Sequence, residues 1–160
     1  MKARCVVGPE NDSGWLAGIR AGNRDALEEV FCTYSGQIVH FLSLVEPSQS
    51  PEATCLDVFE DLWRSAPTIP PRGVLADWLF CRAYRVMRER ASPTERRSFV
   101  QRIALMGTLT FEQRVIVALV YGIRLPLESI LKITAMTATE VSVHLSEARE
   151  RVRHQLVRRS

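Results

Sequence analysis

The chain lacks the features that mark membrane and secreted proteins. Its 160 residues contain no apolar run near the roughly 18–20 residues that a bilayer-spanning helix needs. The first residues are basic but hold few apolar side chains before Gly8 and Pro9, so we expect no signal peptide. These absences predict a cytoplasmic protein with no membrane insertion.

Cysteine, histidine and glycine are also scarce. The cysteines form no C-x-x-C pair and have no histidine at a metal-ligand offset; they are Cys5, Cys32, Cys55 and Cys81. We expect buried free thiols and no metal site, with a zinc site or a disulfide framework as the alternative. The histidines stand beside no nucleophile motif, and no glycine-rich loop could cradle a phosphate. We therefore predict no catalytic site and no cofactor, and an enzyme is the least favoured class.

Positive charge is abundant in two places. Residues 82–102 contain seven arginines against two glutamates, and the last twelve residues contain five arginines against one glutamate. The segment between them is nearly neutral. Such clustering indicates a polyanionic partner. The alternative is that both segments are ordinary solvated helix faces.

The first half of the chain has helical periodicity. Apolar residues at three- and four-residue steps predict a long helix from Asp25 to Val45, ended by Pro47, and a second helix from Pro51 to Ser65. The expected core face of the second helix is Leu56, Phe59, Leu62 and Trp63. Its other face is acidic, with Asp57, Glu60 and Asp61.

A third helix is predicted from about Val74 to Ala91. At 100° per residue its buried stripe contains Leu75, Leu79, Ala83, Val86 and Met87. A neighbouring face carries Trp78, Arg82, Arg85 and Arg88. Guanidinium groups beside an indole suit nucleic acid, because arginine binds phosphate and an aromatic ring stacks on a base. The alternative is that Trp78 simply caps the core.

The C-terminal part is less regular. Residues 115–121, "VIVALVY", favour a buried strand by propensity, whereas Thr110 as a possible N-cap favours a helix, and the pattern leaves both open. Residues 125–133 predict a short helix, followed by a turn and a long helix from Thr137. The inward stripe of that long helix is Val141, Leu145, Ala148 and Val152. A short helix, a tight turn and a longer helix are typical of a helix-turn-helix unit.

Together these segments resemble a known family. "AGNRDALEEVFCTYSGQIVHFL", "DVFEDLWRSA" and "LADWLFCRAYRVMRER" are similar to the first domain of bacterial extracytoplasmic-function sigma factors, and "LTFEQRVIVALVYG", "LESILKI" and "EARERVR" to their C-terminal domain. The resemblance implies an all-α fold of two small helical domains joined by a short linker, with "VIVALVY" helical. The expected parts are a leader at 1–13, a first domain at 14–92, a linker at 93–107 and a helix-turn-helix domain at 108–160.

The resemblance also implies function. It predicts a subunit that binds core RNA polymerase and directs it to promoter DNA, and that an anti-sigma protein holds inactive. The residues expected at the polymerase are Asp57, Glu60 and Asp61. Those expected at the −10 element are Trp78, Arg82, Tyr84, Arg85 and Arg88. Those expected at the −35 element are Thr137, Thr139, Glu140, Ser142, His144 and Arg149.

Several positions depart from the family pattern. Tyr84 stands where an asparagine is frequent, Ala135 replaces the usual turn glycine, and Ser142 and His144 replace basic residues of the reading helix. Each lost phosphate contact weakens DNA binding and reduces its salt dependence. The departures favour an alternative, in which the chain is a sigma-like DNA-binding or decoy regulator that does not itself initiate transcription.

Overall fold

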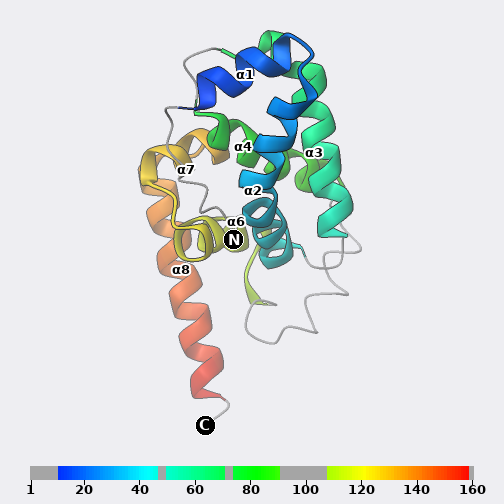
Figure 1. Ribbon diagram of the computed structural model, residues 1–160. Coiled ribbons are helices and arrows are strands. Elements are labelled where there is room, and N and C mark those ends of the chain that lie inside the picture. Colours follow the sequence, from blue (N-terminus) through cyan, green and yellow to red (C-terminus); the bar gives the residue numbers. More distant parts are fainter. Residues whose placement is uncertain (1–10, 47–49, 71–73, 91–107, 159–160) are drawn as a thin grey trace, which may run out of the picture.

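The computed structural model describes residues 11–46, 50–70, 74–90 and 108–158, and within these ranges every regular element is a helix (Figure 1). The all-α fold class is confirmed. The N-terminal half contains α1 (Asp12–Arg20), α2 (Arg24–Val45), α3 (Pro51–Ser65), the short η1 (Ala66–Thr68) and α4 (Leu75–Arg90). The C-terminal half contains α6 (Phe111–Val117), the π-helical η3 (Ala118–Ile123), α7 (Leu127–Thr134) and α8 (Ala138–Val157).

The first helices begin and end at residues with a local reason to be there. The Asn23 side chain accepts a hydrogen bond from the backbone N–H of Asp25 and so caps α2. Ser50 caps α3 in the same way, and Pro51 occupies the first turn, where its missing N–H has no cost. The predicted bounds of α2, α3 and α4 are confirmed to within a residue.

Helix α1 was not predicted as an element. It begins at Asp12, inside the leader expected over residues 1–13, and residues 1–10 lie outside the described ranges. Asp12 is buried because its carboxylate accepts hydrogen bonds from the Leu75 backbone N–H (2.8 Å) and the Tyr34 hydroxyl (3.3 Å). The end of the expected leader is therefore part of the folded structure.

Both halves of the chain contribute to one hydrophobic core. Phe41 of α2 meets Phe80 of α4 edge-to-face with ring centroids 5.5 Å apart, and Leu119 and Ile130 from the C-terminal half belong to the same cluster. In Figure 1, α6 lies beside α2, and α7 lies beside α4. The predicted buried stripe of α4 is confirmed at all five positions. The linker expected over residues 93–107 lies outside the described ranges.

A buried arginine connects the halves. Arg114 of α6 donates to the backbone carbonyls of Val45 (2.9 Å) and Leu109 (3.1 Å) and to the carboxylate of Glu46 (3.3 Å). The side chains of Arg114 and Glu46 are 8% and 9% exposed. Val45 is the last residue of α2, so the guanidinium lies at the negative end of that helix dipole, where a cation is stabilising.

The segment that the pattern left open is helical. Thr110 and Gln113 form a capping box, in which the Thr110 hydroxyl accepts from the Gln113 N–H and the Gln113 side chain accepts from the Thr110 N–H. The chain then runs through α6 and η3 up to Ile123. This confirms the helix that the family resemblance implied and excludes the strand.

Helices α7 and α8 form the predicted helix-turn-helix. Ala135 ends α7 in the left-handed region, with φ +57°, a conformation that costs an alanine about 1–2 kcal/mol. Thr137 and Glu140 form a capping box at the start of α8. Val141 and Ala148 are buried, and Leu145 and Val152 are half-buried, as the inward stripe predicted.

The cysteines differ from the expectation in one case. Cys55 is buried, Cys81 is half-buried, and both are free thiols. Burial raises the pKa of Cys55 to about 11, with a smaller effect of the Glu52 charge, so this thiol stays protonated at neutral pH. Cys32 is free but exposed, because it points away from the core face of α2. Cys5 lies outside the described residues.

Candidate nucleic-acid interface

Helix α4 presents a basic and aromatic face beside a surface hollow. Trp78 and Arg82 are half-buried, Arg85 is exposed, and all three line a hollow of about 410 Å³. Asp61, Ser65 and Thr68 from the end of α3 and from η1 complete its wall. A hollow of this size, with donors and an indole at its edge, suits a phosphate or an unstacked base. The Trp78 ring packs on the core, which confirms the core-capping interpretation, and it also lines the hollow, while its contact with nucleic acid stays a prediction.

The other two residues predicted at the −10 element, Arg88 and Tyr84, differ in exposure. Arg88 is exposed one turn further along α4. Tyr84 is only 6% exposed, because its ring stacks on Phe111 of α6 with centroids 6.0 Å apart. In this arrangement the C-terminal half covers Tyr84, which lies apart from the exposed arginines.

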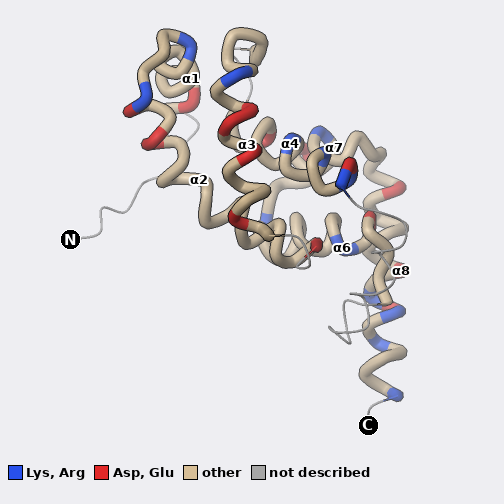
Figure 2. The backbone as a smooth tube through the Cα atoms, turned by 90° about the vertical axis from the view of Figure 1, so that its right-hand side faces the viewer, with Lys and Arg blue, Asp and Glu red and all other residues tan. Residues whose placement is uncertain are grey.

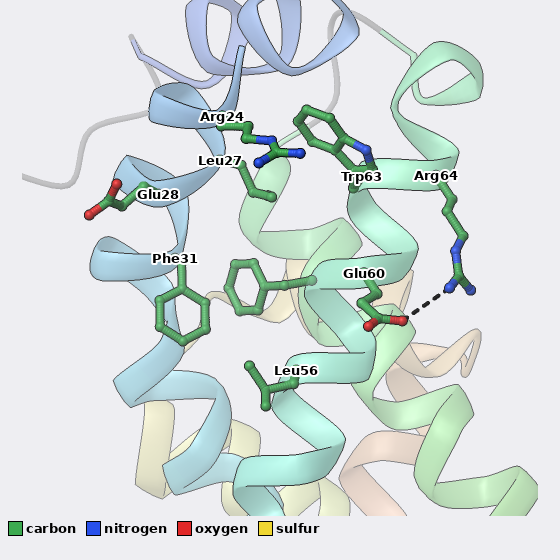
Figure 3. A pocket seen from close by; sticks show the side chains of 9 residues that line it. Arg24, Leu27, Glu28, Phe31, Leu56, Glu60, Trp63 and Arg64 are labelled. Atoms are coloured by element: carbon green, nitrogen blue, oxygen red, sulfur yellow. Dashed lines mark hydrogen bonds and ion pairs between the residues drawn. The ribbon is translucent and has the colours of Figure 1, made fainter. Parts of the chain in front are cut away.

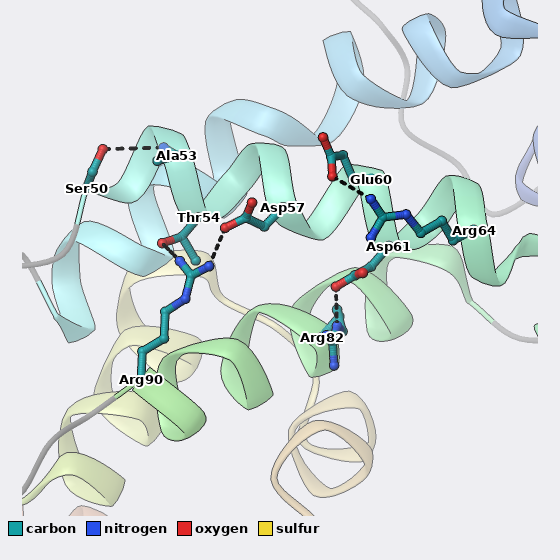
Figure 4. A network of polar contacts seen from close by, with 9 residues as sticks. All are labelled: Ser50, Ala53, Thr54, Asp57, Glu60, Asp61, Arg64, Arg82 and Arg90. Carbon is teal, nitrogen blue, oxygen red and sulfur yellow. Dashed lines mark hydrogen bonds and ion pairs between the residues drawn. The ribbon is translucent and has the colours of Figure 1, made fainter.

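Two carboxylates of α3 are paired with arginines of α4 (Figure 4). Asp61 accepts from the Nε of Arg82 at 2.7 Å. Asp57 accepts from Arg90, which also donates to the Thr54 hydroxyl at 3.1 Å. The aspartates expected at the polymerase therefore face the neighbouring helix.

Glu60 points in another direction from these aspartates. It forms an exposed ion pair with Arg64 one turn later in α3, at 3.1 Å (Figure 4). It also lines a groove between α2 and α3 of about 620 Å³ (Figure 3). Of the three predicted polymerase contacts, Glu60 is the one on this side of α3.

The groove has an apolar floor. Its apolar residues are Leu27, Phe31, Leu56, Phe59 and Trp63. Phe31 of α2 and Phe59 of α3 meet edge-to-face across it with centroids 4.9 Å apart. Leu56 is 56% exposed, so its expected place in the core is wrong: it faces the groove, about 100° from the buried stripe of Phe59 and Leu62. An apolar floor of this kind, open to solvent, is typical of a protein-binding surface.

The start of α8 carries few donors for DNA. Thr139 and Ser142 are exposed and offer hydroxyl groups. Glu140 is occupied by the capping box, where hydrogen bonds from the Thr137 backbone and hydroxyl lower the pKa of its carboxyl group. His144 is half-buried, and its Nδ1 has no hydrogen-bond partner within the described part of the chain.

Arg149 contacts the protein itself. Its Nε donates to the Tyr121 hydroxyl at 3.1 Å, and its guanidinium lies 5.9 Å from the centre of that ring. Further basic residues, including Arg151 and Arg153, follow along α8, where Figure 2 shows the positive charges. Positive charge on α8 is thus concentrated from Arg149 onward, away from the other residues predicted at the −35 element.

Sequence reasoning missed the groove between α2 and α3. Its signal was available in part, since Leu27 and Phe31 lie one turn apart on α2 and Leu56 and Trp63 two turns apart on α3. An amphipathic pattern does not say which apolar residues lie at the edge of a helix–helix contact. That depends on how the two helices pack.

Comparison with known proteins finds a match in structure and none in sequence. No family model matches the chain, and no curated protein matches it in sequence. A solved structure does match: the structure of CnrH in complex with the cytosolic domain of CnrY, with a TM-score of 0.78. The match covers 93% of this chain and 99% of CnrH, at 18% sequence identity. The fold is that of an extracytoplasmic-function sigma factor.

The likeness shows the fold. CnrH is bound to the cytosolic domain of CnrY in the matching structure. Within the described ranges, no helix is long and apolar enough to span a bilayer.

Proposed function

We propose that this protein is an extracytoplasmic-function sigma factor, which binds core RNA polymerase and directs it to specific promoters. The observation that carries the proposal is the α4 face, where Trp78, Arg82 and Arg85 surround one hollow on a fold shared with CnrH. Arginine binds phosphate, and indole stacks on an unpaired base. Such a surface suits the −10 element, which is held as a single strand when a promoter opens.

The polymerase would bind the α2–α3 groove. Leu56 and Trp63 offer apolar contact area, and Glu60 and Arg64 at its edge offer charges of both signs. These features match the partly apolar centre and polar rim of a protein interface. Of the predicted polymerase contacts, Glu60 lies at this groove, and Leu56 is a further contact that we propose.

The −35 element would be read by α8 with a reduced set of contacts. Thr139 and Ser142 offer hydroxyl donors, whereas the Thr137 hydroxyl donates to Glu140, and no Lys or Arg occupies the first two turns of the helix. A missing bidentate Arg–guanine pair removes about 1–3 kcal/mol of discrimination at a base. The affinity would therefore come mainly from α4 and the polymerase, because a holoenzyme combines contacts to two sites on one DNA.

The reduced set of −35 contacts on α8 also favours a second candidate function. A chain of this fold with weak −35 contacts could serve as a sigma-like decoy or accessory DNA-binding regulator that does not initiate transcription. The two candidates differ in whether the chain forms an active holoenzyme. An anti-sigma protein is the further partner that we propose for the initiation factor, by analogy with the CnrY domain on CnrH.

The test is competition of the purified chain with a housekeeping sigma factor for core polymerase, followed by transcription from selected promoters. Saturable binding and a defined start site are expected. A folded chain that does not bind core polymerase would favour the regulator.

Variants then assign the faces. Arg85→Ala with Arg88→Ala should impair promoter opening, measured by permanganate reactivity of unpaired thymines, while polymerase affinity is unchanged. Arg124→Ala is the control, since Arg124 is exposed at the end of η3, outside both arginine-rich segments. Loss of polymerase binding in the double variant would contradict the assignment of α4 to DNA.

A further inference from the structure

Two opposite edges of α3 carry different chemistry. Thr54, Asp57 and Asp61 follow each other at steps of three and four residues, so they share one edge, and this edge faces α4. Leu56 and Trp63 lie on the other edge, facing the groove. The buried stripe of α3 separates the two edges. A residue on the edge that faces α4 therefore contacts side chains of α4 and lies away from a partner bound in the groove.

The pair of Asp61 and Arg82 has a specific geometry. Asp61 accepts from the Nε of Arg82 at 2.7 Å, which leaves the four N–H groups on the two terminal nitrogens for other acceptors. The side chains are 24% and 31% exposed, and both line the hollow with Trp78 and Arg85. A guanidinium held at Nε keeps its terminal fork, the part that binds phosphate in a bidentate manner, pointing away from the carboxylate.

We propose that Asp61 is a positioning residue for nucleic-acid binding: it holds Arg82 so that its terminal nitrogens face DNA phosphate at the hollow beside Trp78. Asp61 then makes no contact with the polymerase. This inference rests on the proposed function and deepens it, since it moves one carboxylate from the polymerase surface to the support of the DNA surface.

The effect of the Asp61–Arg82 pair on nucleic-acid affinity depends on the charge of the carboxylate and on the conformational entropy of the Arg82 side chain. A carboxylate near a polyanion is repulsive by itself, but Arg82 and Arg85 line the same hollow and outweigh its charge. Fixing a long side chain before binding removes an entropic cost that association would otherwise carry, a difference of about two- to tenfold in affinity for one residue. A partly exposed ion pair contributes little to folding, so its removal should leave the fold intact.

The experiment is a double-mutant cycle with Asp61→Ala, Arg82→Ala and both together. Affinity for a fluorescent single-stranded −10 oligonucleotide is measured in the holoenzyme and with the free chain, alongside affinity for core polymerase and the Tm. Asp61→Ala should weaken oligonucleotide binding about two- to tenfold when Arg82 is present and not when it is alanine. Polymerase affinity and Tm should change little. Asp61→Asn, which retains an acceptor for the Nε donor, should recover part of the loss.

Asp57→Ala is the matched control. Asp57 is also an α3 aspartate paired with an α4 arginine, but Arg90 lies at the far end of α4 from the hollow. Asp57→Ala should therefore leave oligonucleotide affinity unchanged. If Asp61→Ala lowers polymerase affinity whether or not Arg82 is present, Asp61 is a polymerase contact and the inference is wrong. It is equally wrong if Asp61→Ala strengthens oligonucleotide binding while Arg82 is present.

The design separates this inference from the proposed function. A wild-type chain that does not bind core polymerase would refute the sigma-factor function. The cycle with the free chain and the oligonucleotide still measures whether Asp61 acts through Arg82. Equal effects of Asp61→Ala with and without Arg82 in that cycle would refute the positioning role.

Discussion

Removal of Arg114 should cost far more stability than removal of any exposed arginine. Arg114→Ala removes the ion pair that Arg114 makes with the buried Glu46 carboxylate and takes donors from the carbonyls of Val45 and Leu109. Breaking a buried ion pair from one side costs about 3–5 kcal/mol. A typical domain has about 5–15 kcal/mol of stability, so this change removes a large share.

The assay can use the uneven distribution of tryptophan. All three tryptophans, Trp15, Trp63 and Trp78, lie in the N-terminal half, so their fluorescence in urea reports that half, while far-UV circular dichroism reports every helix. In the wild type we expect the two transitions to coincide, because the halves share one core. In Arg114→Ala the circular dichroism transition should move to lower urea and separate from the fluorescence transition.

Arg64→Ala is the matched control. Arg64 also pairs with a glutamate, but the two side chains are 70% and 65% exposed, and a helical i,i+4 pair of this kind contributes about 0.2–0.5 kcal/mol. A loss below about 1 kcal/mol for Arg114→Ala, with coincident transitions, would refute the reasoning. It would mean that the buried ion pair between the halves does not form in solution.

Three smaller changes test other features of the fold. Gly18→Ala should destabilise the folded protein by about 1–3 kcal/mol in thermal unfolding, because the added Cβ would meet the Ala26 Cβ at 2.8 Å. Gly14→Ala, in the same helix, adds a Cβ that meets nothing within 4 Å and should be neutral or stabilising. Equal effects of the two changes would contradict the close approach of α1 to α2. Ala135→Gly should leave stability unchanged or raise it by up to about 1 kcal/mol, since glycine adopts positive φ without strain; a marked loss in urea unfolding would show that the turn is not left-handed. Glu140→Gln should destabilise α8 at neutral pH. The folded state lowers the pKa of Glu140, so its contribution is present above the ordinary carboxyl value of about 4.5 and is lost as the pH falls through the folded pKa; urea midpoints that differ equally at pH 3 and pH 7 would contradict this.

The sequence predicted much of the helical framework because its signals are local. Asn23, Ser50 and Thr137 start helices by bonding to backbone groups two or three residues away, and Pro47 and Pro51 mark the break between α2 and α3. Periodicity identified the buried stripe of α4 at every position. These features need no knowledge of distant segments.

The candidate site was predicted less completely. Periodicity placed Trp78, Arg82 and Arg85 on one face of α4, and the structure brings these three to one hollow. It did not predict that Asp61 would bind Arg82. Such a pair depends on the register of α3 against α4, which is set by core packing over a separation of 21 residues.

By itself the sequence determined the order of α2, α3, α4, α7 and α8 and the positions where arginines gather, since each depends on neighbours within one or two helical turns. Only the tertiary structure decided which of these groups are available. It buries Tyr84 under Phe111, exposes Leu56 to the groove, and joins the two halves through Arg114. The physical reason is that availability depends on packing between segments far apart in the chain, and helical periodicity carries no information on that contact.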